Sequence, residues 1–386
     1  MKKYKTLIRT LHLWLGLSSG VVVVIVGLTG ASLVFEEEGR ELFQHGYYHV
    51  AIPFTMANPG DAATPGDLRA SSPLTPQRLP LQQQTDTFKA RYPAEKIQSI
   101  RFKEAADAAT IFFTKTRMVS IDPYTSTITG VRNMNGDFFT VVQKIHTQLY
   151  LGEVGKQIIR WNVLIFFLMC ISGLVLWWPK QRRFFRQAIR INFKTRNLKR
   201  LNWDLHSVLG FYALLVLLII SLTGLFWTFD TAKSLAAMIT GGKVPAKEEK
   251  VRIKPGRAAA TTHPFSIDDA YRYASANYPG ANETFVAPAT DSTTPIRVLM
   301  RYPYTIVRRQ NTLFFNPNNG RLLKAELYSA YTAYDKVARS NYDFHTGRIR
   351  VLGPGSKIIY FLAALMAASL PITGFMIWLG KRRKKP

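Results

Sequence analysis

The chain has 386 residues, and its 51 Lys and Arg against 24 Asp and Glu give a formal net charge of +27. The single cysteine, Cys170, excludes a disulfide within the chain and any cysteine-rich zinc or iron–sulfur site. No Cys-x-x-Cys-His motif is present, which excludes covalently attached haem. We interpret the positive charge as a topology signal and a fit to anionic membrane lipid, and we expect no nucleic-acid binding.

Four segments are apolar and free of Asp, Glu, Lys and Arg, namely 13–35, 161–178, 205–229 and 358–380. Each is close to the roughly 20 residues that span a bilayer as a helix. The first is too long for a removed signal peptide and lacks a small-residue cleavage site, so we expect a permanent anchor. The sequence therefore predicts a four-span α-helical membrane protein.

Basic residues gather in the tail before the first span, in the link 180–200 and in the tail after the fourth span. The link has nine basic residues and no acidic one. By the positive-inside rule these three segments are cytoplasmic, and both termini with them. The expected order is tail and first span 1–35, first periplasmic module 36–145, His-Thr segment and second span 146–178, basic link 179–203, third span 204–229, second periplasmic module 230–344, His-Thr segment and fourth span 345–380, and basic tail 381–386.

The two halves of the chain repeat one order of motifs. The first outside segment reads "RYPAEKIQSIRF" and then "VSIDPYTSTITGV", and the second reads "NYPGANETFV" and then "LFFNPNNGRLLKA". After these, "KIHTQLYLG" corresponds to "DFHTGRIRV", and "SGLVLWWPKQRR" to "TGFMIWLGKRRK". The pattern predicts an internal duplication. Parallel repeats usually pack about an axis along the membrane normal, with sites at the interface between the halves.

Each outside segment is predicted to form a small α+β module. We expect a helix before each Tyr-Pro pair and strands at "ATIFFTK", "MVSID", "IRVLMRY" and "TLFFN", which are short and rich in β-branched and aromatic residues. Turns are expected at Asp-Pro and at Asn-Pro-Asn-Asn-Gly. Residues 57–84 and 241–262 are typical of poorly ordered connections.

Histidine and glycine recur at equal spacing in the first and third spans. Each histidine is followed by glycine four and eighteen residues later: His12, Gly16 and Gly30, and His206, Gly210 and Gly224. Eighteen residues are five helical turns, so each histidine shares a face with the distant glycine, about 27 Å away. Histidines in bilayer spans are rare and costly, and one that recurs in register indicates a ligand.

The other two spans offer the reverse arrangement, with histidine before the outer end and glycine near the inner end. The inner face then has His12, His206, Gly173 and Gly374, and the outer face has His146, His345, Gly30 and Gly224. Two neutral imidazoles are suitable axial ligands for haem, and glycines, including Gly16 and Gly210, let helix backbones approach a porphyrin. We predict two bis-histidine b-type haems, His12 with His206 and His146 with His345, that form an electron path across the bilayer.

Several alternatives remain open for the histidines. A lone histidine at a membrane interface is more often a snorkelling residue than a ligand, and glycines at helix interfaces are a generic packing device. His45, His49 and His263 have no counterpart in the other half and are expected at the surface, although His45 or His49 could replace a predicted ligand. Zinc or copper is disfavoured because each face offers only two histidines and no Cys or well-placed carboxylate.

The pattern resembles the PepSY-associated transmembrane family, the iron-regulated inner-membrane proteins of Gram-negative bacteria. The resemblance covers essentially the whole chain and rests on "LHLWLGL" and "LHSVLGF" in the spans and on the two outside modules. Within that family the chain looks most like the siderophore reductases with two haems. The resemblance implies a bacterial inner-membrane location, haem, and the release of iron from ferric hydroxamate-type siderophores, with ferrioxamine as a first guess at the substrate.

We therefore expect an oxidoreductase, a ferric-siderophore reductase, and assign no catalytic side chain. No Gly-x-Gly-x-x-Gly motif and no large cytoplasmic domain are present, so electrons must come from an external donor: a reduced flavin, a soluble reductase or quinol. The alternatives are a b-type cytochrome that serves a protein partner, a haem-free PepSY interaction protein, or a permease or permease accessory.

Overall fold

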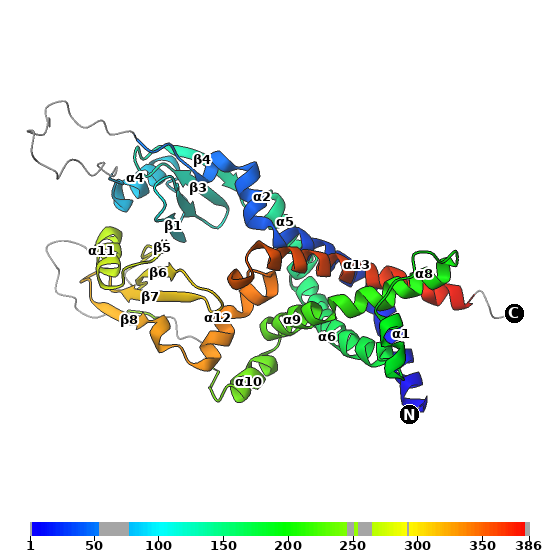
Figure 1. Cartoon of the computed structure of the whole chain (residues 1–386). Coiled ribbons are helices and arrows are strands. Elements are labelled where there is room, and N and C mark those ends of the chain that lie inside the picture. The colour runs from blue at the N-terminus through cyan, green and yellow to red at the C-terminus, as the bar shows by residue number, and fades with distance from the viewer. Residues whose placement is uncertain (1, 54–76, 245–250, 254–264, 292, 383–386) are drawn as a thin grey trace, which may run out of the picture.

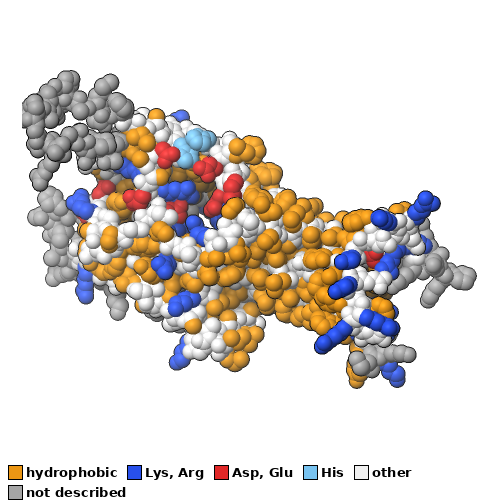
Figure 2. Space-filling view, in the orientation of Figure 1, with side chains coloured by type: hydrophobic (Ala, Val, Ile, Leu, Met, Phe, Trp, Pro, Cys, Tyr) orange, Lys and Arg blue, Asp and Glu red, His pale blue; other side chains and the backbone are white. Residues whose placement is uncertain are grey.

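The molecule has a bundle of long helices at one end and a β-sheet at the other (Figure 1). The computed structural model describes residues 2–53, 77–244, 251–253, 265–291 and 293–382. The start of the first helix and the end of the last one lie at the end of the bundle farthest from the sheet. The link between the second and third long helices lies there too, and Lys and Arg side chains gather around it (Figure 2). We call this the basic end and the opposite end of the bundle the sheet end.

Among the residues that the structure describes, four helices are long and apolar enough to cross a membrane. They are α1 (Lys2–Val34), α6 (Gly152–Trp177), α8 (Leu198–Asp204) continued by a π turn (Leu205–Leu209) into α9 (Gly210–Thr228), and α13 (Pro354–Arg382). The four predicted spans are thus confirmed as helices. A band of hydrophobic side chains covers the bundle between the basic end and the sheet (Figure 2), as a multi-pass membrane protein requires.

Helices α1 and α13 approach each other closely along small residues. A Cβ atom on Gly27 would lie 3.1 Å from the Cβ of Ala368, and one on Gly20 would lie 3.1 Å from the Cβ of Pro371. Small residues let helix backbones come together in a membrane, where packing replaces the hydrophobic effect between helices. These contacts hold the first and last spans side by side.

The predicted modules share one antiparallel sheet of eight strands, in the order β4-β3-β2-β1-β5-β6-β7-β8. The first segment supplies β1 (Ser99–Lys103), β2 (Thr110–Phe113), β3 (Arg117–Ile121) and β4 (Ile128–Asn133), and the second supplies β5 (Glu283–Ala287), β6 (Ile296–Tyr302), β7 (Arg309–Phe315) and β8 (Leu322–Glu326). At the junction, Ile100 of β1 is opposite Val286 of β5, and both are fully buried. Pairing β1 with β5 removes the edge that each module would otherwise expose.

Two helices pack on the sheet, α4 (Leu81–Arg91) and α11 (Ile267–Asn277). Both end just before the Tyr of a Tyr-Pro pair, as predicted. The core between helices and sheet contains the fully buried Phe88, Phe112 and Phe315. Asp268 of α11 accepts the backbone N–H groups of Leu81 and Gln82 at 2.7 and 2.9 Å, so one module caps the helix of the other.

The strand predictions are confirmed in β2, β3, β6 and β7, and the turns predicted at Asp-Pro and Asn-Pro-Asn-Asn-Gly join β3 to β4 and β7 to β8. No sequence segment was named in advance for β1, β4, β5 or β8. The prediction that all of 57–84 is poorly ordered is wrong at its end, because residues 81–84 form the first turn of α4 and Gln84 is buried. The rest of that segment up to residue 76, and most of 241–262, lie outside the described residues.

Two further helices connect the sheet to the bundle, α5 (Phe138–Gln148) and α12 (Ala333–Thr346). The remaining helices are α2 (Glu36–Phe43), α3 (His45–Tyr48), α7 (Phe185–Ala188) and α10 (Asp230–Ile239), with short 3-10 turns at Arg182–Phe184, Tyr328–Ala330 and Arg350–Leu352. Arg348 and Lys357 bond Glu37 and Glu38 of α2 at 2.7 and 2.5 Å. These ion pairs tie α2 to the start of the fourth span.

Candidate cofactor site: two histidine pairs

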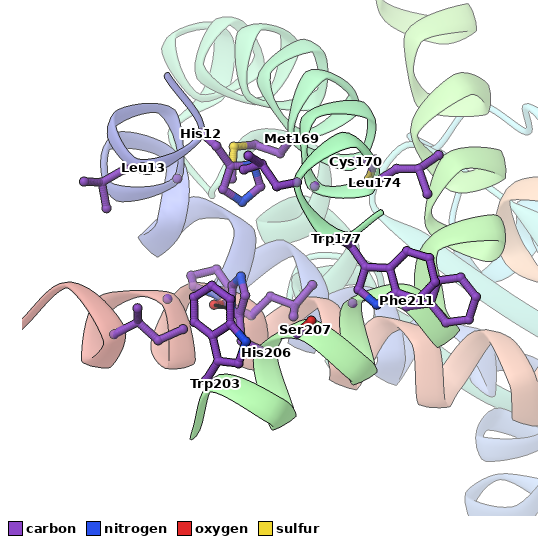
Figure 3. Close-up of a pocket in the computed structure, with 18 of the residues that line it drawn as sticks. His12, Leu13, Met169, Cys170, Leu174, Trp177, Trp203, His206, Ser207 and Phe211 are labelled. Carbon is purple, nitrogen blue, oxygen red and sulfur yellow. Dashed lines mark hydrogen bonds between the residues drawn. The ribbon is translucent and has the colours of Figure 1, made fainter. Parts of the chain in front are cut away.

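At the basic end, His12 and His206 line one cavity of about 820 Å³. His12 comes from α1 and His206 from the π turn before α9, and Figure 3 shows them on opposite sides of the cavity. Trp177 and Phe211, whose ring centroids are 3.9 Å apart, form another part of its wall. The volume is in the range of pockets that hold cofactors, about 300–1,000 Å³.

At the sheet end, His146 and His345 face each other across the bundle. They lie near the C-terminal ends of α5 and α12, and their ring centroids are 6.3 Å apart. A metal–imidazole bond is about 2.0–2.1 Å and the ring centre lies some 1.1 Å behind the nitrogen, so two imidazoles on opposite sides of one metal have centroids about 6.2–6.4 Å apart. The ring spacing of the outer pair therefore fits two imidazoles that would hold one metal ion between them. The 72° angle between the rings is compatible, since each ring can rotate about its bond.

Each of the four histidines is held through Nδ1 by a neighbouring span. The three that bond a carbonyl and a threonine hydroxyl are His146 (Val26 O 3.1 Å, Thr29 Oγ1 3.1 Å), His345 (Ile220 O 3.1 Å, Thr223 Oγ1 2.9 Å) and His206 (Leu370 O 3.1 Å, Thr373 Oγ1 2.9 Å). His12 differs, because its Nδ1 lies 2.8 Å from Ser172 Oγ and no carbonyl contact accompanies it in the described chain.

These bonds determine which ring nitrogen carries the proton. A carbonyl oxygen only accepts, so Nδ1 must donate in His146, His206 and His345. The Ser172 hydroxyl donates to the Met169 carbonyl at 3.2 Å, which leaves it to accept from His12. In all four rings Nε2 then keeps a free lone pair. This is the arrangement by which proteins orient histidines that ligate a metal.

The glycines predicted at each face lie against the imidazole rings. A Cβ atom would be 3.1 Å from His146 Cε1 at Gly30, 3.5 Å from His12 Cε1 at Gly173, 3.8 Å from His345 Cε1 at Gly224, and 3.3 Å from His206 Cε1 at Gly374. The space that each glycine provides is thus occupied by a histidine of the neighbouring helix. These glycines thus make room for the histidine rings, and their predicted clearance of a porphyrin face stays a prediction.

Gly16 and Gly210 have other neighbours. A Cβ on Gly16 would lie 3.0 Å from Met169 Cε, and one on Gly210 would lie 3.6 Å from Leu370 Cδ2. Both glycines still line the inner cavity.

The third span corrects one detail of the spacing argument. His206 lies in a π turn over Leu205–Leu209, so the 18 residues to Gly224 do not make five regular turns there. A π turn accommodates an extra residue in the helix and is frequent at functional sites. In α1, which is a regular helix from Lys2 to Val34, the predicted spacing of His12 and Gly30 is unbroken.

Sequence reasoning missed the groups that position the histidines. Each histidine bonds a Ser or Thr that directly precedes a predicted glycine, in the pairs Thr29-Gly30, Ser172-Gly173, Thr223-Gly224 and Thr373-Gly374. These four dipeptides were a visible signal. Their hydroxyls and glycines act together, one to hold the imidazole and the other to make room for it.

A second missed signal is the repeated pentapeptide "NWDLH" and "NYDFH", which ends at His206 and His345. Its Asn donates to the backbone carbonyl of the threonine that bonds the histidine: Asn202 to Thr373 at 2.9 Å, and Asn341 to Thr223 at 3.1 Å. Its Asp is buried and pairs with arginine: Asp204 with Arg200 at 2.9 Å, and Asp343 with Arg308 at 2.5 Å. The pentapeptide thus fixes a histidine helix to the span beside it.

The outer histidines lie on α5 and α12, outside the four spans, and both are held neutral. Burial lowers the pKa of His146 to about 4. Burial and the neighbouring His146 lower the pKa of His345 to about 3. A neutral imidazole is the form that binds a metal.

The other described histidines belong to the surface, as predicted. His49 bonds Asp107 at 2.7 Å and Glu41 at 3.0 Å, and the stacked ring of His45 lies 4.4 Å away. Hydrogen bonds to Asp107 and Glu41 raise the pKa of His49. Neither histidine contacts the two pairs, and His263 lies outside the described residues.

The two histidine pairs can be compared with the number of protein ligands that a zinc ion or a haem needs. No cluster of three or more His, Cys, Asp or Glu side chains that could bind a metal ion occurs in the described part of the chain. A structural zinc site needs four protein ligands and a catalytic one three. Haem iron needs only two from the protein, because the porphyrin supplies the rest. Two histidines per face, each with a free Nε2, fit haem.

The family described as the PepSY-associated TM region matches residues 9–381, which is nearly the whole chain. The chain belongs to this family. The match covers all four spans of this PepSY-associated protein and the sheet between them. No curated protein matches the sequence.

Proposed function

We propose that the protein is an inner-membrane reductase that carries electrons across the bilayer to a ferric siderophore and releases the iron as Fe(II). The observation that supports this most strongly is the pairing of four histidines, two at each end of the bundle, with every Nδ1 engaged by a neighbouring span. Such pairs suit two b-type haems, His12 with His206 and His146 with His345. Bound haem would supply transfer of one electron at a time.

The chain's own residues set the direction and length of the path. The basic end is cytoplasmic by the positive-inside rule, so the sheet lies in the periplasm. Gly30, which contacts His146, lies about 27 Å along α1 from His12. The helix backbone therefore fixes the separation of the two sites at nearly the thickness of the hydrocarbon core, about 30 Å.

The outer pair contacts one aromatic residue at the membrane boundary of the third span. The Trp227 ring lies 4.9 Å from the His345 ring, in the last turn of the third span at the sheet end. A substrate docked there would be close to His345. Hydroxamate oxygens are hard ligands that prefer Fe(III), so one electron weakens the complex and releases the metal. Ferrioxamine is the hydroxamate that we propose to try first.

The visible spectrum of the purified protein tests the cofactor. We expect a Soret band, and an α band that develops with dithionite, at two haems per chain. A protein without these bands, even after expression with added haem, would rule out the reductase and leave a haem-free interaction role.

Rapid mixing tests the substrate. Ferrioxamine added to the dithionite-reduced protein, after removal of excess reductant, should reoxidise the haem and yield Fe(II) that ferrozine traps. A gallium-loaded siderophore, whose metal cannot accept the electron, is the matched control. Reduced haem that is stable toward ferric siderophores would instead indicate a b-type cytochrome that serves a protein partner.

A further inference from the structure

A second cavity of about 670 Å³ opens beside the inner histidine pair at the basic end. Its lining is polar and contains three arginines: Arg186, Gln187, Arg190, Ile191, Asn192, Arg200 and Asp204. Three of these residues, Gln187, Arg200 and Asp204, also line the cavity of His12 and His206. The two cavities are therefore neighbours with a common wall.

The link that carries the arginines is fixed to the bundle. Trp177 of α6 donates its indole N–H to the carbonyl of Ala188 at 3.3 Å, and Tyr212 of α9 donates its hydroxyl to the carbonyl of Ile189 at 3.0 Å. On the other wall, the buried Asp204 bonds Arg200 at 2.9 Å. The arginines are thus presented from an anchored segment.

The charge of the cavity is unbalanced. Asp204 neutralises Arg200, whereas Arg186 and Arg190 have no acidic partner among the residues that the structure describes. Three arginines and one aspartate give a net charge of +2. A phosphate monoester carries about −1.5 to −2 at pH 7 and matches this charge, and arginine forks bind phosphate oxygens in pairs. A lipid phosphodiester carries only one negative charge.

We propose that this cavity binds the phosphate of a reduced flavin mononucleotide, the electron donor. Phe184 and Trp203, which are 45% and 49% exposed, line the edge of the larger cavity and can contact the flavin ring beside the space between His12 and His206 that the inner haem would occupy. Arg186 and Arg190 would hold the phosphate of that flavin. The inference rests on the proposed function. In balance, one reduced flavin gives up two electrons and two protons. The electrons reduce two Fe(III) to Fe(II), and the protons enter the cytoplasmic solvent.

Equilibrium binding of oxidised flavin mononucleotide to the full-length protein in phosphatidylcholine nanodiscs tests the site by fluorescence quenching. Riboflavin, which lacks only the phosphate, is the matched ligand. We expect at least about tenfold tighter binding of the nucleotide than of riboflavin, and competition by inorganic phosphate. The double variant Arg186→Gln/Arg190→Gln should remove this preference. Arg182→Gln/Arg183→Gln deletes equal charge from the same link outside the cavity and should leave the preference unchanged.

Equal binding of the two ligands, or equal effects of the two double variants, would overturn the proposal. So would displacement of the nucleotide by phosphatidylglycerol at its ordinary membrane fraction, because the cavity would then hold a lipid phosphate. Haem content is measured on the same samples. Intact haem without flavin binding defeats only this inference, and flavin binding without haem defeats only the proposed function.

Discussion

The rings of His146 and His345 at the sheet end lie close together, whereas His12 and His206 at the basic end lie on opposite sides of a cavity. The outer rings are 6.3 Å apart, and each bonds a carbonyl and a hydroxyl of a span. The inner cavity measures about 820 Å³, and His12 is held by the Ser172 hydroxyl. Both outer rings are thus fixed by a carbonyl and a hydroxyl, whereas at the inner site only His206 is held in this way and His12 has the hydroxyl alone. Electron entry next to a second cavity is compatible with the more open inner site.

Replacing one predicted haem ligand at either end should have the largest effect and tests the difference between the outer and inner sites. His345→Ala and His12→Ala should each reduce haem to about one per chain, measured as the pyridine haemochrome, because each leaves the other pair complete. His45→Ala, at the surface, should keep two. When haem is titrated into the apo variants, the outer pair left by His12→Ala should bind more tightly than the inner pair left by His345→Ala. Loss of both haems in either variant would show that our pairing is wrong.

The buried ion pairs near each site give the next largest contrast. Asp343→Ala leaves Arg308, whose side chain is only 16% exposed, without its carboxylate, and should lower the free energy of unfolding by about 3 kcal/mol. Asp204→Ala frees Arg200, which is 49% exposed and can be solvated, so the loss should be below about 1 kcal/mol. Thermal unfolding in detergent measures both. Equal losses would contradict a more rigid outer site.

Removing the hydroxyl that bonds a histidine should weaken haem binding more at the inner site than at the outer site. Ser172→Ala removes the Nδ1 partner of His12, and loss of such a partner typically weakens metal binding by about 10–100-fold. Thr223→Val leaves His345 with the Ile220 carbonyl at 3.1 Å, so the effect should be below about tenfold. The rate of haem loss to excess apomyoglobin reports each site. A faster loss from Thr223→Val than from Ser172→Ala would reverse the ranking.

The fold was predictable where a local pattern specifies it. Charge-free runs revealed four spans, and β-branched segments such as 296–302 revealed strands. The joining of the two modules into one sheet could not be predicted, because the β1–β5 pairing links segments that are far apart in the chain. The π turn around His206 was also hidden, because all of its neighbours are compatible with a regular helix.

The site was predictable as far as residue types recur. The histidines and glycines repeat in register, so their gathering at two depths followed from helix geometry. Helix geometry did not predict which atoms bond each histidine ring. The Nδ1 bonds of His146 run to α1 and those of His345 to α9, and such a choice of neighbour depends on how the spans pack. The repeated pentapeptide would have linked His206 with His345.

Glycine substitutions should have the smallest effect and still separate the two ends. Gly30→Ala places a Cβ 3.1 Å from Cε1 of His146, whose ring is fixed by two hydrogen bonds, so the ring must shift. Gly210→Ala meets Leu370 at 3.6 Å, an ordinary contact, and alanine favours a helix by about 1 kcal/mol over glycine. We expect Gly30→Ala to change the spectrum and lower the occupancy of the outer haem alone, and Gly210→Ala to keep both haems with unchanged or slightly higher thermal stability. A normal outer haem in Gly30→Ala would mean that His146 can move, and the outer site would then be no more rigid than the inner one.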